Sequence, residues 1–178
     1  YEIYNDFWYW GITTRGNMIY KVGIGYDVHS LEMGKPFTLG GIKLNHSKGA
    51  VGYSDADVLI HAICDALLGA LNLRDIGFHF PDNEKKYEGI DSKILLKKVI
   101  SLMFENKFEI SNVDSTVCLQ APKLKDYIHE MKLVLAKCMQ INLSQISIKA
   151  TTTEKLGFVG REEGVSCYAV VMIKKLVS

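Results

Sequence analysis

The spacing of apolar residues along the chain predicts several helices and strands. Apolar positions recur at helical spacing in two amphipathic segments, which predicts helices over residues 91–107 and 124–138. Alternating or β-branched apolar residues predict strands over residues 19–26, 110–119, 146–150 and 165–173. Gly40-Gly41 between two short apolar pieces predicts a hairpin within residues 36–47. Periodicity therefore indicates a mixture of helices and strands.

A further helix is predicted over residues 54–71, SDADVLIHAICDALLGAL, and most of its faces are apolar. Ser54 is suited to cap its N-terminus, and the acidic residues that follow suit the positive end of the helix dipole. Asp57, His61 and Asp65 are spaced i, i+4 and i+8, so they share one face of the helix. We therefore expect a buried helix that carries a row of three ionisable side chains.

Two interpretations of this row remain open. In the first, His61 is a core histidine with an ordinary hydrogen-bond partner, and the two aspartates face solvent. In the second, the row binds a cation or a substrate. Burying two carboxylates and an imidazole together costs free energy unless a metal or polar partners compensate, which favours the second interpretation.

Asp27 and His29 follow directly on the strand predicted over residues 19–26. Residues i and i+2 of a strand face the same side, so the pair presents an oxygen and a nitrogen together, which are ligand types that zinc accepts. Alone, such a pair is usually an ordinary surface pair. Together with His61 it makes three protein ligands with an open fourth position, the pattern of a catalytic zinc site.

Two loops carry candidate binding groups. Residues 74–82 combine acids and aromatics with Gly and Pro, which is typical of a binding loop, although a plain surface connection has the same composition. Residues 151–158 place three threonines and Glu154 after a strand. The hydroxyls fit an ST-turn, or they bind phosphate while the carboxylate holds Mg²⁺.

The composition is that of one ordinary globular domain, with 178 residues, 48% hydrophobic and 23% charged. Residues 1–18 show no clean period, so we expect an N-terminal extension or remnant outside the fold, and a domain over residues 19–178. A net charge of +1 provides no global field for nucleic acid, and no apolar run is long enough to span a membrane. We expect neither nucleic acid nor a membrane as partner.

The four cysteines lie singly in apolar segments, without a C-x-x-C pair. This distribution predicts reduced, packed thiols in a reducing compartment. We treat them as structural. They are Cys64, Cys118, Cys138 and Cys167.

Five motifs occur in order over the domain: GYDVH, SDADVLIHAICDALLGA, DIGFHFPD, QAPK and ATTTEKLGFVGR. Together they resemble the 2-C-methyl-D-erythritol 2,4-cyclodiphosphate synthase family, and the resemblance runs from about residue 19 to residue 175. It implies an α+β, single-domain sandwich of a mixed β-sheet with helices packed on one face. It also implies a homotrimer with the sheets around the threefold axis, and active sites at subunit interfaces.

The resemblance assigns metal and catalytic roles to matching residues. Asp27, His29 and His61 match the ligands of one zinc ion per site, and Glu154 matches the carboxylate that holds Mg²⁺ or Mn²⁺ with the substrate diphosphate. Thr152 matches the position credited with transition-state stabilisation. Tyr53 is the other expected catalytic residue, and it departs from the family, which usually has His there; a phenol donates but does not titrate at pH 7.

The resemblance also implies the substrate contacts. The part of the family's site that receives the erythritol and the ribose matches Ser54, Asp75, Ile76, Gly77, Phe80 and Asp82. Asp57 is a further expected substrate contact. The cytidine and phosphate pocket of the neighbouring subunit matches Gln120, Ala121, Pro122, Lys123, Leu124, Lys125, Ala150, Thr151 and Thr153. Phe158 and Arg161 match residues near an apolar channel on the threefold axis, suited to an isoprenoid diphosphate. Tyr168 departs from the acidic residue expected beside that channel.

The implied reaction converts 4-diphosphocytidyl-2-C-methyl-D-erythritol 2-phosphate to 2-C-methyl-D-erythritol 2,4-cyclodiphosphate and CMP, in non-mevalonate isoprenoid biosynthesis. The 2-phosphate attacks the β-phosphorus of its own molecule, so the protein orients the substrate and neutralises charge. Two alternatives are a metal-dependent phosphohydrolase and a zinc-containing nucleotide-binding module. With 18 Lys against 3 Arg and an extra N-terminal segment, a plastid-type, apicoplast-like organelle is as plausible as a bacterial cytoplasm.

Overall fold

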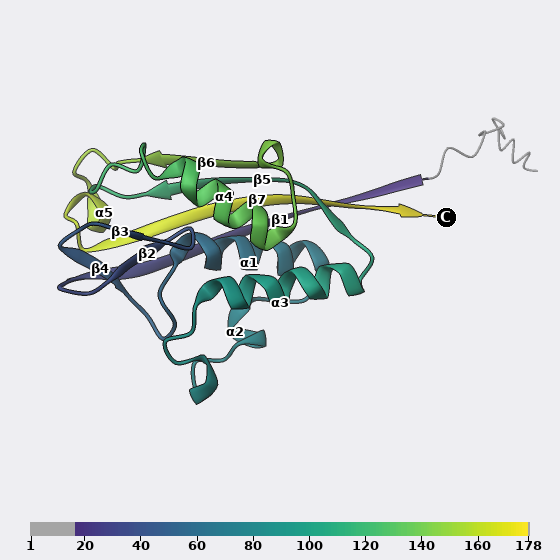
Figure 1. Cartoon of the computed structure of the whole chain (residues 1–178), viewed down its shortest axis with the longest axis horizontal. Helices are drawn as coiled ribbons and strands as arrows, with labels where there is room; N and C mark the ends of the chain where they lie inside the picture. The colour runs from purple at the N-terminus through teal and green to yellow at the C-terminus, as the bar shows by residue number, and fades with distance from the viewer. Residues whose placement is uncertain (1–16, 178) are drawn as a thin grey trace, which may run out of the picture.

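A computed structural model describes residues 17–177, which form a mixed sheet with helices against it (Figure 1). The elements in chain order are β1 (Asn17–Met33), β2 (Phe37–Leu39), β3 (Ile42–Leu44), β4 (Lys48–Val51), α1 (Val58–Leu71), α2 (Ile76–His79), the 3₁₀ turn η1 (Lys85–Tyr87), α3 (Ser92–Glu105), β5 (Glu109–Cys118), α4 (Ile128–Met139), the 3₁₀ turn η2 (Leu143–Gln145), β6 (Ile146–Thr151), α5 (Gly157–Gly160) and β7 (Gly164–Val177).

The main sheet has the strand order β4-β1-β7-β5-β6. β1 is antiparallel to both β4 and β7, β7 is antiparallel to β5, and β5 and β6 run parallel. β2 and β3 form a separate antiparallel hairpin around Gly40-Gly41, as predicted. The predicted α+β class with a mixed sheet is confirmed.

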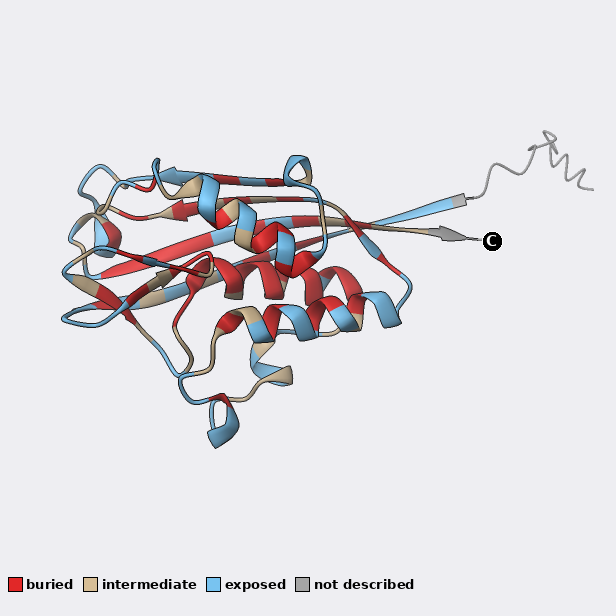
Figure 2. Cartoon of the chain, in the orientation of Figure 1, coloured by how far each residue is buried: buried red, intermediate tan, exposed pale blue. Residues whose placement is uncertain are grey.

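The core lies between one face of this sheet and the helices. α1 is buried along most of its length and packs on β1 and β7, while α3 packs beside α1 and α4 packs against α3 and β6 (Figure 2). The opposite face of β1 carries exposed apolar side chains at alternate positions, with Val22 65% and Ile24 70% exposed. These outward positions are Tyr20, Val22, Ile24, Tyr26 and Val28.

Two glycines let α1 approach β1 closely. A Cβ atom on Gly23 would lie 1.9 Å from the Ala66 carbonyl oxygen, and one on Gly25 would lie 1.9 Å from that of Ala62. Any side chain at these positions would push the helix off the strand. The glycines therefore set the distance between the strand that carries Asp27 and His29 and the helix that carries His61.

The predicted helix over residues 54–71 starts later than expected, at Val58, and its N-cap is Asp57, whose side chain accepts a hydrogen bond from the Ile60 backbone N–H. The prediction that Ser54 caps α1 is therefore wrong. Ser and Asp both suit an N-cap. Asp57 takes this position because its carboxylate also accepts hydrogen bonds from the backbone of the β2–β3 hairpin.

Other boundaries differ by a few residues. α4 begins at Ile128 and not at residue 124, since Leu124 is buried in a turn that precedes the helix. α3 begins directly after its cap Asp91, close to the prediction. Residues 74–82 contain the single-turn helix α2. Residues 1–16, most of the expected N-terminal extension, lie outside the described residues; β1 begins at Asn17, which pairs with Val177.

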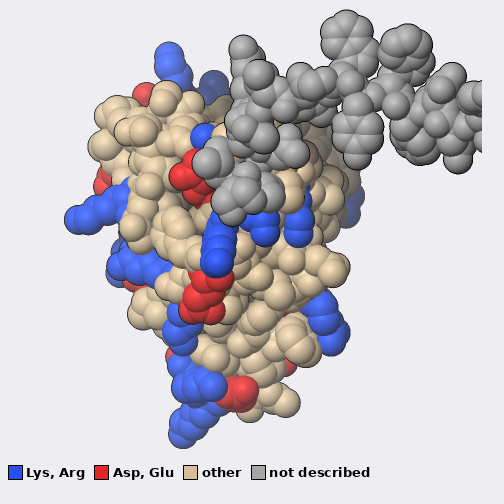
Figure 3. Space-filling view, turned by 90° about the vertical axis from the view of Figure 1, so that its right-hand side faces the viewer, with Lys and Arg blue, Asp and Glu red and all other residues tan. Residues whose placement is uncertain are grey.

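The four cysteines are free thiols, as predicted. Burial raises the pKa of Cys64, Cys138 and Cys167. Among residues 17–177 no helix is long and apolar enough to cross a membrane. On the face shown in Figure 3, Lys and Arg are interspersed with Asp and Glu, in keeping with the net charge of +1.

Candidate active site

Asp27, His29 and His61 converge at the point where β1 meets the first turn of α1. Asp27 Oδ2 lies 2.9 Å from His29 Nε2 and 3.0 Å from His61 Nδ1, and the two ring nitrogens lie 3.1 Å apart. All three side chains are partly buried, and they are the one group of potential metal ligands found among the described residues. The structure thus brings together the three ligands predicted from sequence.

The donor set fits a divalent metal ion. His29 Nδ1 donates to the Val51 carbonyl oxygen at 3.0 Å, which leaves Nε2 of the neutral ring as an acceptor aimed at Asp27 and His61. Acceptor atoms this close repel one another unless a proton or a cation lies between them. In a tetrahedral zinc site with bonds of about 2.0–2.1 Å, ligand atoms lie roughly 3.3–3.4 Å apart, so the triangle needs to open by only a few tenths of an ångström.

The pKa values of Asp27 and His29 are both shifted by the contact between the carboxylate and the imidazole. Burial raises the pKa of Asp27, but the hydrogen bonds and charges of His29 and His61 outweigh it and hold the pKa far below its usual value. Burial lowers the pKa of His29, but the hydrogen bond and charge of Asp27 outweigh it and raise the pKa above 6.5. The cluster therefore stabilises positive charge between its members.

The other nitrogen of His61 faces two serines. Nε2 lies 2.9 Å from Ser92 Oγ and 3.1 Å from Ser54 Oγ. Ser54 Oγ also accepts from the Ala56 backbone N–H at 3.2 Å. Ser92, the first residue of α3, was not among the predicted site residues, and the only sequence signal at this position is an Asp-Ser pair that begins a helix.

The remaining members of the predicted row have structural partners. The carboxylate of Asp57 is fully buried and accepts hydrogen bonds from the backbone N–H groups of Gly40 at 2.9 Å and Gly41 at 2.6 Å, besides that of Ile60. Asp57 lines neither of the pockets described below, so the expected substrate contact is replaced by an anchor between α1 and the hairpin. Asp65 Oδ1 accepts from the Ile76 N–H at 2.7 Å and holds the start of α2.

A pocket of about 240 Å³ opens beside the triad. Eight of the predicted residues line it, two of them metal ligands and six from the segments before and after α1. The other three come from η1, α3 and the segment between them, and the sequence did not suggest them. The lining comprises His29, Tyr53, Ser54, His61, Ile76, Gly77, Phe80, Asp82, Tyr87, Ile90 and Leu95. Asp75 does not line it, because its carboxylate caps α2 by accepting from the Phe78 N–H at 2.9 Å.

Tyr53 is 37% exposed at the edge of this pocket. Burial raises its pKa above 10, and the charges of Glu88 and Asp82 raise it further. The phenol therefore stays protonated at neutral pH and has a proton to donate.

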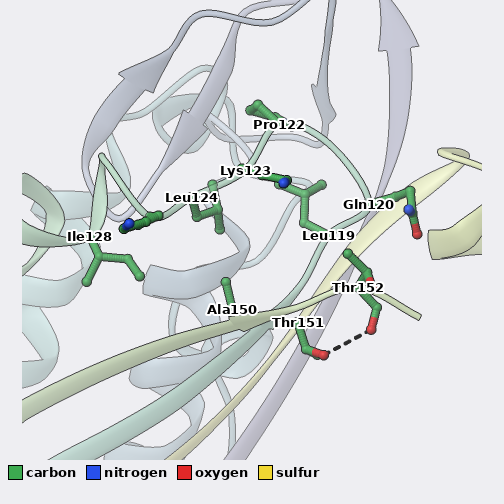
Figure 4. A pocket seen from close by; sticks show the side chains of 10 residues that line it. Leu119, Gln120, Pro122, Lys123, Leu124, Ile128, Ala150, Thr151 and Thr152 are labelled. Carbon is green, nitrogen blue, oxygen red and sulfur yellow. Dashed lines mark hydrogen bonds between the residues drawn. The ribbon is translucent and has the colours of Figure 1, made fainter. Parts of the chain in front are cut away.

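A second pocket, of about 270 Å³, lies where β5 and β6 end (Figure 4). Most of the residues predicted for the cytidine and phosphate pocket line it: Gln120, Pro122, Lys123, Leu124, Lys125, Ala150, Thr151 and Thr152, together with Leu119 and Ile128. Ala121 and Thr153 lie next to these residues in sequence but do not line the pocket. The two pockets have no residue in common.

Two polar features lie at this second pocket. The buried Oε1 atom of Gln120 has no hydrogen-bond partner within the described chain. Thr152 Oγ1 donates to Glu154 Oε1 at 2.7 Å, and both residues are exposed. Glu154 thus lies with the second pocket and does not join the ligand triad.

The residues expected near a threefold axis come from α5, the position after it and β7. Arg161 forms a two-pronged ion pair with Glu163, at 3.0 and 2.9 Å. The ring of Phe158 lies against Gly164, where an added Cβ would come within 2.8 Å of it. Tyr168 packs against Tyr26 with ring centroids 4.7 Å apart.

Comparison with known proteins identifies relatives along nearly the whole described chain. The family model described as the YgbB family matches residues 20–174. The 2-C-methyl-D-erythritol 2,4-cyclodiphosphate synthase of Bacteroides fragilis is 60% identical over 156 residues, which cover 88% of this chain and 98% of that protein. The enzyme of the same name from Porphyromonas gingivalis is 56% identical over 86% of this chain and 95% of its own.

Solved structures share the fold. The bifunctional IspDF from Campylobacter jejuni matches with a TM-score of 0.87 and 38% identity, covering 90% of this chain; this chain spans 44% of that protein. The IspF of Plasmodium falciparum in complex with CDP matches with a TM-score of 0.78 and 33% identity, over 89% of this chain and 97% of that one.

The curated relatives at 56–60% identity come from bacteria. Of the two locations that the sequence left open, they do not support the plastid-type organelle. The resemblance carried by the five motifs is confirmed by the extent and identity of these matches. The chain belongs to the YgbB family.

Proposed function

We propose that the chain converts 4-diphosphocytidyl-2-C-methyl-D-erythritol 2-phosphate to 2-C-methyl-D-erythritol 2,4-cyclodiphosphate with release of CMP. The observation that carries the proposal is the position of the Asp27-His29-His61 triad at the wall of a pocket lined by Ser54 and the 76–82 loop. The names of the relatives support the same reaction. Its place is isoprenoid precursor biosynthesis by the non-mevalonate pathway.

The triad would hold a zinc ion, since two imidazoles and one carboxylate are ligands that zinc accepts and three of them leave a position open. Glu154 would hold Mg²⁺ or Mn²⁺ through its exposed carboxylate. When bound, the two ions supply positive charge against the phosphate oxygens. Because nucleophile and electrophile belong to one substrate, the side chains need only fix its folded geometry and exclude water.

The chain's own polar groups have distinct tasks in this proposal. Ser54 and Asp82 face the pocket and bind the hydroxyls of the erythritol, and Gly77 allows the backbone to approach it. The Tyr53 hydroxyl donates to a phosphate oxygen. In the second pocket, the unpartnered Gln120 Oε1 accepts from a donor of the cytosine or ribose, and Thr152 donates to the transferring phosphate.

The same proposal includes a homotrimer. The two pockets have no residue in common, whereas one substrate must reach both the triad and the cytidine pocket. The exposed apolar face of β1 offers a surface for neighbouring copies, because contiguous exposed apolar side chains mark interaction sites. Tyr168 lies on this side of the sheet against Tyr26. An isoprenoid diphosphate in a central channel near Phe158, Arg161 and Tyr168 remains a prediction.

The test is product analysis with the purified full chain, zinc and magnesium. The proposal predicts equal amounts of CMP and cyclic diphosphate and no inorganic phosphate. A metal-dependent phosphohydrolase would release inorganic phosphate, and a nucleotide-binding module would bind CDP without turnover. Either result would replace the proposed reaction by that alternative.

Subunit sharing has its own test. His61→Ala alters the triad and Thr152→Ala alters the second pocket, so each variant alone should be inactive or nearly so. If each site uses both chains, co-assembled mixtures should recover part of the activity, because some interfaces then contain two intact halves. Mixtures shown to contain both subunits but lacking any recovery would mean that each site is built within one chain.

The bacterial relatives favour a bacterial cytoplasm as the location.

A further inference from the structure

Ser92 connects His61 to a carboxylate that lies outside the predicted triad. Its side chain is fully buried, and Ser92 Oγ lies 2.9 Å from His61 Nε2. On its other side, the Ser92 hydroxyl donates to Asp55 Oδ1 through a short hydrogen bond, and the Ser92 backbone N–H donates to Asp55 Oδ2 at 3.1 Å. His61, Ser92 and Asp55 therefore form one hydrogen-bond network behind the three metal ligands.

The direction of these hydrogen bonds follows from the chemistry of the groups. An ionised carboxylate only accepts, and a serine hydroxyl has one proton. When that proton is donated to Asp55, Ser92 Oγ has only lone pairs left for His61. His61 Nε2 must then carry the proton and donate it to Ser92, and Nδ1 keeps its lone pair.

Asp55 is itself held in place. Its backbone N–H donates to the Ile90 carbonyl oxygen at 3.1 Å, and its Oδ1 also accepts from the Asp57 backbone N–H at 3.3 Å. Ser92 is the first residue of α3, so its free N–H and the positive end of the helix dipole favour the carboxylate at this place. The network is thereby tied to both loops that flank the pocket.

We propose that Ser92 and Asp55 are positioning residues that orient His61 and fix its Nε2-protonated form, so that Nδ1 is presented to the metal. The proposal rests on the metal site of the proposed function. Ser54 Oγ, 3.1 Å from Nε2, is the competing acceptor, but it faces the substrate pocket and is available to the substrate, whereas Ser92 does not line that pocket. Groups that orient a metal-bound imidazole typically change metal affinity about 10- to 100-fold when removed.

The first test is zinc affinity, measured by competition with a chromophoric chelator on the full chain. Ser92→Ala should weaken binding about 10- to 100-fold, and Ser92→Thr, which keeps the hydroxyl, should restore it. Ser101→Ala is the matched control, because Ser101 is an exposed serine of the same helix that donates only to the Lys97 carbonyl oxygen. Zinc binding by Ser92→Ala at wild-type strength would overturn the proposal.

A double-mutant cycle separates this role from general support of the fold. Asp55→Ala should also weaken zinc binding, and the double variant with Ser92→Ala should bind no more weakly than the weaker single variant, because both changes break one relay. Fully additive losses would mean that the two residues act independently and would contradict the relay. A wild-type chain that binds no zinc would contradict the proposed function and the relay together, so the two failures are distinguishable.

Histidine ¹⁵N spectra of the zinc-loaded wild-type chain show which ring nitrogen of His61 carries the proton. This part of the test does not depend on a folded variant. Zinc on Nδ1 and a slowly exchanging Nε2–H are the expected pattern for His61, with that proton exchanging rapidly in Ser92→Ala and protected again in Ser92→Thr. The two zinc-bound histidines are told apart because His29 donates its Nδ1–H to the Val51 carbonyl oxygen and so coordinates through Nε2. Coordination through Nε2, or an unprotected Nε2–H in the wild type, would overturn the proposal.

Discussion

Replacing Gly25 by Ala should damage the fold and the metal site together. The new Cβ would lie 1.9 Å from the Ala62 carbonyl oxygen and 2.7 Å from the Ala66 nitrogen, whereas real Cβ contacts rarely fall below 3.0–3.4 Å. The helix must therefore retreat from the strand by roughly 1 to 1.5 Å to restore normal contact. Both obstructing atoms are backbone, so no side-chain rotation relieves the overlap.

The consequences follow from that displacement. Overpacking costs about 1–3 kcal/mol, and the upper end applies because backbone has to move. For a chain of this size, about 3 kcal/mol corresponds to a melting temperature lower by roughly 6–12 °C. Since α1 carries His61 and β1 carries Asp27 and His29, the same retreat spreads the ligand triangle, and a 1 Å misplacement lowers the rate about 100-fold.

Gly69→Ala is the matched control, because it makes the same substitution on the other side of the contact, on α1 where it faces β1. Its Cβ would come no closer than 3.9 Å to the Ile24 carbonyl oxygen, and Ala is better than Gly in a helix by about 1 kcal/mol. Stability should be unchanged or slightly higher, and zinc content unchanged. Thermal melts at fixed protein concentration, zinc analysis and CMP release are the assays. If Gly25→Ala matched Gly69→Ala in all three, the argument from close packing would be refuted.

Three further predictions test single residues. His61→Ala should lose zinc while the circular dichroism spectrum remains that of the fold; stoichiometric zinc in this variant would contradict the ligand assignment. Asp57→Ala should lower the free energy of unfolding by at least about 3 kcal/mol, from a lost cap and two unsatisfied backbone N–H groups, and urea denaturation at wild-type midpoint would argue against it. Tyr53→Phe should lower kcat/KM about 5- to 150-fold and leave the shape of the pH profile near neutrality unchanged, because the pKa of the Tyr53 hydroxyl is raised above 10 and the group does not titrate there. Tyr53→His should add a limb near pH 6.5, and wild-type kinetics in Tyr53→Phe would leave the hydroxyl without a role.

The ligand triad was predictable because its three members obey local periodicities. Asp27 and His29 are two residues apart on a strand, and His61 interrupts an apolar helix, so residue type and spacing indicated a metal site without knowledge of the fold. What the sequence does not contain is the distance between strand and helix. That distance depends on Gly23 and Gly25, whose importance appears only when α1 is seen to lie on them.

The residues behind the triad were not predictable for a different reason. Ser92 and Val51 lie 31 and 22 residues from the histidines they contact, and neither belongs to a periodic pattern that points to His61 or His29. Their positions depend on where the loops after β4 and before α3 pass. A buried polar side chain at a helix start is compatible with many folds, so its partner is visible only in the folded chain.

The row on α1 shows how a correct pattern leads to a partly wrong interpretation. Asp57, His61 and Asp65 do share a side of the helix, but the helix lies between several neighbours, and each side chain meets a different one. Asp57 holds the β2–β3 hairpin through two backbone N–H groups, His61 faces β1, and Asp65 holds the N–H at the start of α2. Periodicity reports which residues point the same way, whereas burial and partners decide what each one does. The outer two carboxylates therefore fix the elements around the site, and only His61, between them, is positioned to bind a metal.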